Sequence, residues 1–120
     1  MFDHQFEFSA LLAPDGRVVE ISASALAATG VSRDAVVGAC FWEMPWWRTL
    51  PHVQRQWRQQ IADALAATTP VRGDATFMAA DGTLRYAMYV VTALRDAAGA
   101  VEWLLVEAID STDRKQAEDA

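Results

Sequence analysis

Aromatic side chains gather in one short stretch of this chain, and they are its most distinctive candidates for binding chemistry. The cluster consists of Phe41, Trp42, Trp46 and Trp47, with Trp57 further along the chain. Large aromatic rings bury much apolar area, so they often fill the core of a small domain. The same rings also line cavities that hold small, partly apolar ligands. Pro45 makes the stretch irregular, and ligand-gated movement can start in such a segment. The cluster can therefore be part of the core or the wall of a ligand cavity, and both interpretations stay open.

One pairing of side chains could support catalysis, namely Glu107 with Tyr89 or Tyr86. Small isomerases on a cone-shaped antiparallel sheet place a carboxylate base and a tyrosine donor in an apolar pocket. Side chains alternate between the faces of a strand, and we expect Glu107 and Tyr89 to face opposite ways. We therefore expect no enzymatic activity and keep this enzyme only as an alternative. No cysteine, histidine or carboxylate cluster has metal-ligand spacing, so no metal is expected.

The composition of the 120 residues indicates one globular domain in a reducing compartment. The net charge is −6 and no basic stripe exists, so neither nucleic acid nor direct membrane contact is expected. A single cysteine excludes an internal disulfide. No apolar run approaches the roughly 20 residues of a membrane span. We expect no signal peptide, because Met1–His4 lacks a basic region followed by an apolar stretch. We therefore expect a cytoplasmic protein.

Periodicity and turn residues predict strands and helices in separate groups along the chain. The predicted strands span residues 6–12, 17–21, 75–79, 84–94 and 101–109, and the clearest helix spans residues 51–67. A short helix over residues 22–28 and a single turn near residues 32–37 come between the second strand and the aromatic stretch. Strands grouped in runs favour an antiparallel sheet with helices on one side, which is an α+β fold.

The last predicted strand is apolar on both faces, which is typical of a strand that is covered on both sides. The helices cover only one face. The residues of the other face are Trp103, Leu105, Glu107 and Ile109. We expect this face to contact a second copy of the chain, so a homodimer is predicted. The alternative is an open apolar surface, which a monomer tolerates up to a few hundred Å².

The junction after the last strand, Asp110–Lys115 with the sequence DSTDRK, resembles the ending of PAS domains, the sensory modules of bacterial histidine kinases and other two-component signalling proteins. The similarity continues through two hairpins, DGRVV from Asp15 and RDAAGAV from Arg95, and through the stretch TGVSRDAVVG from Thr29. The stretch FWEMPWW from Phe41 resembles an aromatic motif of one PAS subgroup, Phe-Trp-x-x-Pro-Trp-Trp.

The resemblance implies a five-stranded antiparallel sheet with short helices and one longer helix on one face. A PAS domain would occupy residues 1–112, and residues 113–120 would start a C-terminal output helix. Such a domain is a non-catalytic sensory and dimerisation module of a multidomain signalling protein. We expect flanking signalling domains in the parent chain, either a histidine kinase or a diguanylate cyclase. A ligand-free structural dimerisation module is the alternative.

By analogy with the family, a small cavity lies between the helices and the sheet. The apolar side chains available for its wall indicate an apolar or aromatic ligand, or none. Its expected wall consists of Trp42, Trp46, Trp47, Trp57, Phe77, Tyr89, Val91, Val106 and Ala108. The opposite strand faces would place Tyr86 and Met88 inside instead, and periodicity does not decide between them. The resemblance also assigns Asp110 and Thr112 to signal relay, because they tie the last strand to the outgoing helix. A simple local turn and helix cap is the alternative.

Neither flavin nor haem is expected as a cofactor. Flavin-binding light sensors of the family carry a reactive cysteine in a Gly-x-Asn-Cys-Arg-Phe-Leu-Gln motif, and Cys40 stands one place too early with the other polar residues missing. Haem-binding members use a histidine, and His52 at the start of the long helix has no second ligand. A carboxylate ligand would need a cation facing the cavity, for which only Arg85 has a suitable position.

Overall fold

A five-stranded antiparallel sheet is the centre of the computed structural model, which describes residues 7–119. The strands are β1 (Phe8–Leu12), β2 (Val18–Ile21), β3 (Val71–Met78), β4 (Leu84–Arg95) and β5 (Val101–Asp110). Their order across the sheet is β2-β1-β5-β4-β3. The predicted α+β fold is therefore confirmed, and β5 is the central strand. Position 6, where the first strand was expected to begin, lies outside the described residues.

Helices occupy the middle of the chain and its C-terminal end. The helices are α1 (Ala23–Thr29), α2 (Pro51–Ala66) and α3 (Thr112–Asp119), with 3-10 turns η1 (Arg33–Ala35), η2 (Phe41–Glu43) and η3 (Pro45–Trp47). The Ser22 hydroxyl accepts a hydrogen bond from the Ala25 N–H at the start of α1. Gly30 ends α1 with a left-handed backbone, φ 70°. Pro51 opens α2 at a position where its missing N–H leaves no hydrogen bond unmade.

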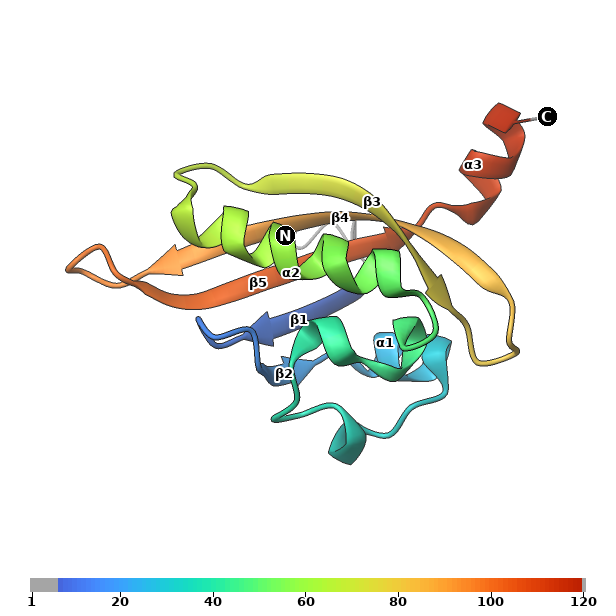
Figure 1. Cartoon of the computed structure of the whole chain (residues 1–120), viewed down its shortest axis with the longest axis horizontal. Helices are drawn as coiled ribbons and strands as arrows, with labels where there is room; N and C mark the ends of the chain where they lie inside the picture. The colour runs from blue at the N-terminus through green and yellow to red at the C-terminus, as the bar shows by residue number, and fades with distance from the viewer. Residues whose placement is uncertain (1–6, 120) are drawn as a thin grey trace.

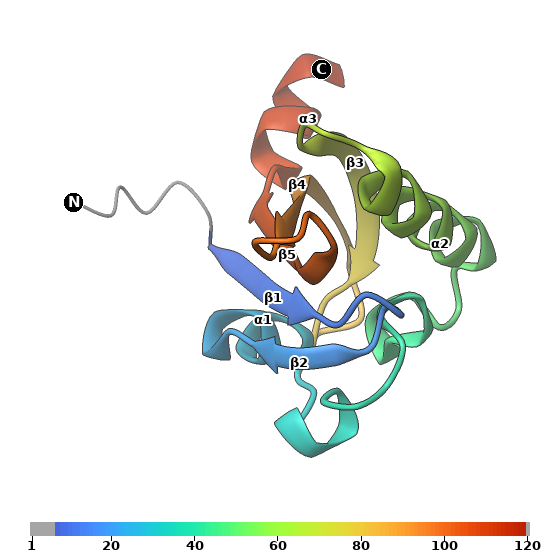
Figure 2. The ribbon, with the colours of Figure 1, turned by 90° about the vertical axis from the view of Figure 1, so that its left-hand side faces the viewer.

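The helices α1 and α2 lie across one face of the sheet, whereas α3 extends beyond its end (Figure 1). The view along the sheet shows the strands curving around the side on which α2 lies (Figure 2). Buried residues on this inner face come from both central strands: Ala87, Tyr89, Val91, Leu104 and Val106. The core therefore sits between the sheet and the helices, where the apolar stripe of α2 meets the strands.

One strand differs clearly from the prediction. We expected β3 over residues 75–79, but it begins at Val71, which pairs with Val91 of β4. Gly73 and Asp74 are poor strand formers, so local propensity hid this part of the strand. A Cβ atom on Gly73 would lie 2.5 Å from the hydroxyl oxygen of Tyr89. Tertiary contact with Tyr89 therefore explains why a glycine stands there.

Candidate functional site

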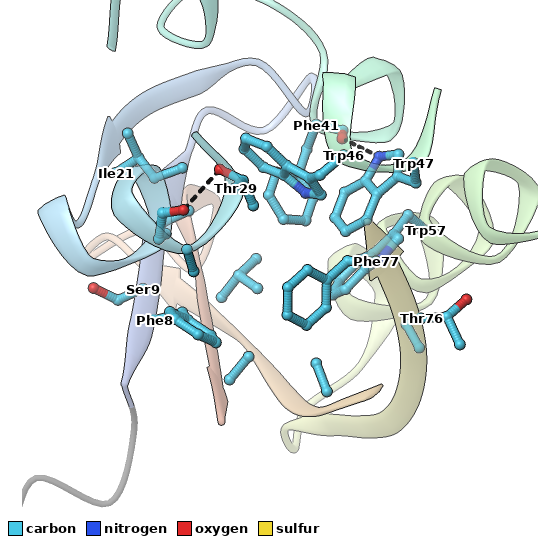
Figure 3. Close-up of a pocket in the computed structure, with 17 residues that line it drawn as sticks. Phe8, Ser9, Ile21, Thr29, Phe41, Trp46, Trp47, Trp57, Thr76 and Phe77 are labelled. Carbon is cyan, nitrogen blue, oxygen red and sulfur yellow. Dashed lines mark hydrogen bonds between the residues drawn. The ribbon is translucent and has the colours of Figure 1, made fainter. Parts of the chain in front are cut away.

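A cavity of about 70 Å³ lies between the inner face of the sheet, α1, α2 and the aromatic stretch (Figure 3). Most of its wall is apolar. The lining residues are Phe8, Ser9, Ala10, Ile21, Ala25, Ala28, Thr29, Phe41, Trp46, Trp47, Trp57, Ala75, Thr76, Phe77, Ala87, Val106 and Ala108. None of these side chains is ionisable, so the described part of the wall offers no charge to a ligand.

The tryptophans form both the core and the wall of the cavity. The Trp47 and Trp57 rings stack with centroids 5.3 Å apart, and Phe41 meets both rings edge-on. The Trp47 indole N–H donates to the Phe41 carbonyl oxygen at 3.0 Å. Trp46 packs edge-on against Trp47 at 5.5 Å and stands at one end of the cavity (Figure 3). These rings therefore belong both to the core and to the cavity wall, so both interpretations of the cluster apply to them.

Trp42 does not line the cavity, although we expected it there. Its ring approaches Gly16, and the guanidinium of Arg58 lies 5.7 Å from its ring centroid. The 3-10 turn η2 directs Phe41 inward and leaves Trp42 half-buried near the first hairpin. Trp42 therefore supports the turn at Gly16 rather than the cavity.

The sheet presents to the cavity the face that the family analogy favoured. Phe77, Val106 and Ala108 line it, whereas Tyr89 and Val91 lie on the same inner face but outside the lining set. Tyr86 and Met88 occupy the opposite face, because side chains alternate along β4. Whether any of these residues binds a ligand remains a prediction.

Sequence reasoning missed the contribution of α1 and β1 to the cavity. Ala25, Ala28 and Thr29 of α1 and Phe8 of β1 belong to the wall. The signal in the sequence was the alanine-rich segment ASALAAT, whose small side chains leave space between α1 and the sheet. The Thr29 hydroxyl donates to the Ala25 carbonyl at 2.8 Å, so its proton is used within the helix.

Tyr89 joins β4 to α2 through its hydroxyl. That hydroxyl donates to the Gln60 side-chain oxygen at 2.8 Å and accepts from the Gln56 amide at 3.2 Å. Its ring packs on Trp57 with centroids 4.2 Å apart. Burial raises the pKa of Tyr89, partly offset by the hydrogen bond from Gln56. The tyrosine hydroxyl is thus committed to α2 rather than to the cavity.

Asp110 and Thr112 lie together at the point where β5 passes into α3. The Thr112 hydroxyl and amide both donate to one carboxylate oxygen of Asp110, and Arg85 of β4 donates to the other. The Thr112 hydroxyl also accepts from the Tyr86 amide at 3.0 Å. Thr112 is only 4% exposed. The junction is therefore tied to β4 on one side and to the first turn of α3 on the other.

The two charged side chains of this junction, Asp110 and Arg85, each stabilise the ionised form of the other. Burial opposes ionisation of Asp110, but hydrogen bonds from Arg85 and Thr112 outweigh it, so the pKa of Asp110 lies below its ordinary value. The same carboxylate raises the pKa of Arg85. Arg85 is therefore paired with Asp110 and is absent from the cavity wall, which removes the only cation that we had considered for a carboxylate ligand.

The outer face of the sheet carries Trp103, Leu105, Glu107 and Ile109, all half-buried. Glu107 stands in the ladder between Val90 of β4 and Ser9 of β1. Within residues 7–119 its carboxylate forms no hydrogen bond or ion pair. An apolar face with a charge at its centre is consistent with a partner surface, and the predicted homodimer remains a prediction.

The other candidate residues lie outside the cavity. His52 is exposed on the first turn of α2, and half-buried Cys40 precedes η2. In the part of the chain that the structure describes, no three histidine, cysteine or carboxylate side chains gather as a metal site would require. None of the helices in residues 7–119 combines the length and hydrophobicity of a membrane span.

Comparison with known proteins agrees with the fold. The sensor histidine kinase TmoS of Ectopseudomonas mendocina is 30% identical over 121 residues, which cover 98% of this chain but only 12% of that protein. The PAS domain of BvgS from Bordetella pertussis superposes with a TM-score of 0.74 at 21% identity, over 98% of this chain and 85% of that one. Vibrio cholerae VqmA, in a complex with ligand and DNA, gives a TM-score of 0.77 at 18% identity, over 93% of this chain and 49% of that one.

These structural similarities, at identities below 25%, establish the shared fold. The family evidence comes from the sequence itself. The PAS-fold family model matches residues 2–116, which is nearly the whole chain. Because that match includes the aromatic stretch, the cavity wall and the Asp110–Thr112 junction, the chain belongs to the PAS-fold family.

Proposed function

We propose that this chain is the non-catalytic sensory domain of a multidomain signalling protein, which binds a small apolar or aromatic ligand and relays its presence to α3. One observation carries the proposal: the cavity wall and the output junction share the inner face of the sheet at the same end. Ala87 lines the cavity and pairs with Asp110, and Phe77 lines it and pairs with Arg85.

The geometry supplies a direct route from ligand to helix. Ala108 lines the cavity and stands two positions before Asp110 on β5. A ligand that pushes against Phe77, Ala87 or Ala108 moves backbone that also carries the Arg85–Asp110–Thr112 contacts. Packed cores respond to such pressure by changing between discrete arrangements. The ligand would then favour one arrangement of β5 and α3 over another.

A second copy of the chain is the proposed partner of the outer sheet face. Trp103, Leu105 and Ile109 form an apolar strip along β5, and Val90 of β4 continues it. Burial of this strip in a homodimer would place two α3 helices so that they could transmit a change together. We propose a cytoplasmic location, consistent with the single cysteine, and an output domain beyond α3 such as a histidine kinase or a diguanylate cyclase.

Neither haem, flavin, metal nor nucleic acid is part of the proposed function. His52 and Cys40 lie outside the cavity wall. The VqmA complex contains DNA, but this chain has a net charge of −6, which disfavours direct contact with phosphates. The enzyme alternative is weakened because Glu107 and Tyr89 face opposite sides of the sheet. Tyr86 shares the face of Glu107 but stands four positions from its partner Val90, roughly 13 Å along the strand.

The second candidate function is a ligand-free dimerisation module, which the small volume of the cavity favours. An engineered cavity of about 150 Å³ holds benzene, and this cavity has about half that volume. Native mass spectrometry of the freshly purified chain separates the two. Extra mass that leaves on denaturation supports the sensor, and bare protein that also fails to bind small apolar probes supports the structural module.

A further inference from the structure

The polar groups of the cavity wall are unevenly distributed between donors and acceptors. The Trp47 N–H donates to the Phe41 carbonyl, and the Thr29 hydroxyl donates to the Ala25 carbonyl (Figure 3). The Ser9 and Thr76 hydroxyls point away from the space that the wall surrounds (Figure 3), so two indole N–H groups remain, those of Trp46 and Trp57. Neither has a hydrogen-bond partner among residues 7–119. The wall therefore offers donors to a ligand without offering it any charge.

Trp46 is the donor that a ligand can reach. The Trp57 ring is enclosed by Phe41, Trp47 and Tyr89, with centroids 4.2 to 5.3 Å away, and its nitrogen is fully buried. Among the rings of residues 7–119, Trp46 packs against that of Trp47 alone. Although the Trp46 residue is 94% buried, since only 6% of it is exposed, Figure 3 shows its indole nitrogen turned toward the space that the lining side chains surround.

A ligand that fills the cavity keeps water from the Trp46 N–H, and a donor cut off from water without another partner is unfavourable. A ligand that supplies an acceptor removes this penalty, whereas a pure hydrocarbon leaves it in place. A carboxylate is disfavoured because no cation among residues 7–119 lines the wall. An ammonium is disfavoured because no carboxylate of the same residues lines it.

We infer that the ligand is a small uncharged molecule whose single hydrogen-bond acceptor, a carbonyl or ether oxygen or an aromatic nitrogen, binds the indole N–H of Trp46. This inference rests on the proposed ligand-binding function and gives the cavity its chemical selectivity. The rest of the molecule is apolar, because it contacts Phe8, Phe77 and the alanines of α1 and the sheet. The volume, about half that of a cavity that holds benzene, limits it to a small molecule, and a probe built on a five-membered ring enters only if the wall moves outward.

Two probes of nearly equal shape test the acceptor. Cyclopentanone carries a carbonyl oxygen where methylenecyclopentane carries a CH₂ group. The two probes differ in how strongly water solvates them, so their affinities for the same chain cannot be compared directly. The informative quantity is the change in the affinity of each probe that Trp46→Phe causes. We expect cyclopentanone to bind roughly threefold to tenfold more weakly to Trp46→Phe than to the unaltered chain, and methylenecyclopentane to bind both equally. Trp42→Phe is the matched control and should leave the affinity for cyclopentanone unchanged, because Trp42 does not line the cavity.

The indole signals in a ¹H–¹⁵N spectrum supply a readout independent of affinity. The signal that Trp46→Phe removes identifies the Trp46 N–H, and its proton should shift downfield with cyclopentanone but not with methylenecyclopentane. Equal effects of Trp46→Phe on both probes would overturn the acceptor inference and leave the cavity as a ligand site. Loss of affinity in Trp57→Phe instead would show that the wrong donor was assigned. Failure of both probes to bind would contradict the proposed sensor function as well.

Discussion

Ala87, in the cavity wall, lies directly opposite Asp110 in the ladder between β4 and β5. The residue that a ligand would touch is therefore paired with the residue that holds the start of α3. Asp110 also binds Arg85 and Thr112, so the same strand pair joins the cavity to both sides of the junction. Each of the following predictions tests one link of this route.

Removal of the Thr112 hydroxyl should weaken the junction. Thr112→Val deletes the donor to Asp110 and leaves the Tyr86 amide without its acceptor in a buried site. We expect the free energy of unfolding to fall by about 1–3 kcal/mol, measured by urea titration. Thr112→Ser keeps the hydroxyl and should recover most of the loss. Equal destabilisation by both substitutions would show that the methyl packing, rather than the hydroxyl, is what matters.

Stability should depend on the charge of Asp110 at low pH. The pKa of Asp110 is lower in the folded chain than the unfolded value of about 3.9. Its contribution is therefore fully present above that value and is lost as the pH falls through the folded pKa. Titrations with urea at several pH values should show a smaller decrease for Asp110→Asn than for the unaltered chain. Neighbouring Glu7, which accepts from the Asp110 amide, remains in both chains as a common background.

The absence of a side chain at Gly73 should be necessary for the position of Tyr89. Gly73→Ala places a Cβ atom 2.5 Å from the tyrosine hydroxyl, so the ring must move away from Gln56 and Gln60. We expect a loss of about 1–3 kcal/mol in the free energy of unfolding. In a background of Tyr89→Ala the same substitution should cost little, and a double-mutant cycle measures the difference. Additive effects would contradict the steric explanation.

Filling the cavity should abolish ligand binding without unfolding the chain. Ala108→Leu adds a large side chain to the wall on the central strand. We expect no binding of cyclopentanone by calorimetry and an unchanged circular dichroism spectrum. Ala93→Leu is the matched control, because Ala93 is a half-buried alanine on β4 that does not line the cavity. Equal loss of binding in both variants would place the ligand elsewhere.

A charge on the outer sheet face should disrupt the proposed homodimer. Leu105→Arg puts a cation in the apolar strip of β5, where burial against a second copy would be unfavourable. We expect the mass measured by light scattering to fall from dimer to monomer. Val37→Arg, on an exposed position away from the sheet, should leave the mass unchanged. A monomeric mass for the unaltered chain at high concentration would remove this part of the proposal.

The sheet could be predicted because its signals are local. Alternating apolar residues and the Asp81-Gly82 and Asp96–Gly99 turns mark the hairpins. The first half of β3 could not be predicted, because Gly73 is explained by a tyrosine on the neighbouring strand. Partners distant in sequence leave no local pattern.

The cavity was only partly predictable for a similar reason. Rings such as Trp46 and Trp57 were recognised as wall candidates because large aromatic residues are conspicuous. Ala25 and Ala28 contribute space instead of contacts, and a run of alanines does not by itself show where in the fold that space opens. Trp42 was assigned to the cavity with its neighbours, but a 3-10 turn sends adjacent side chains in different directions.

The central claim is that a ligand in the cavity changes the contacts that hold α3. The most direct test follows the backbone amide signals of Tyr86 and Ser111, because the Tyr86 amide donates to Thr112 and the Ser111 amide donates to the Tyr86 carbonyl. Cyclopentanone should shift both signals in the unaltered chain and neither in Ala108→Leu. Saturating binding that leaves both signals in place would show that the cavity and the output helix are not coupled.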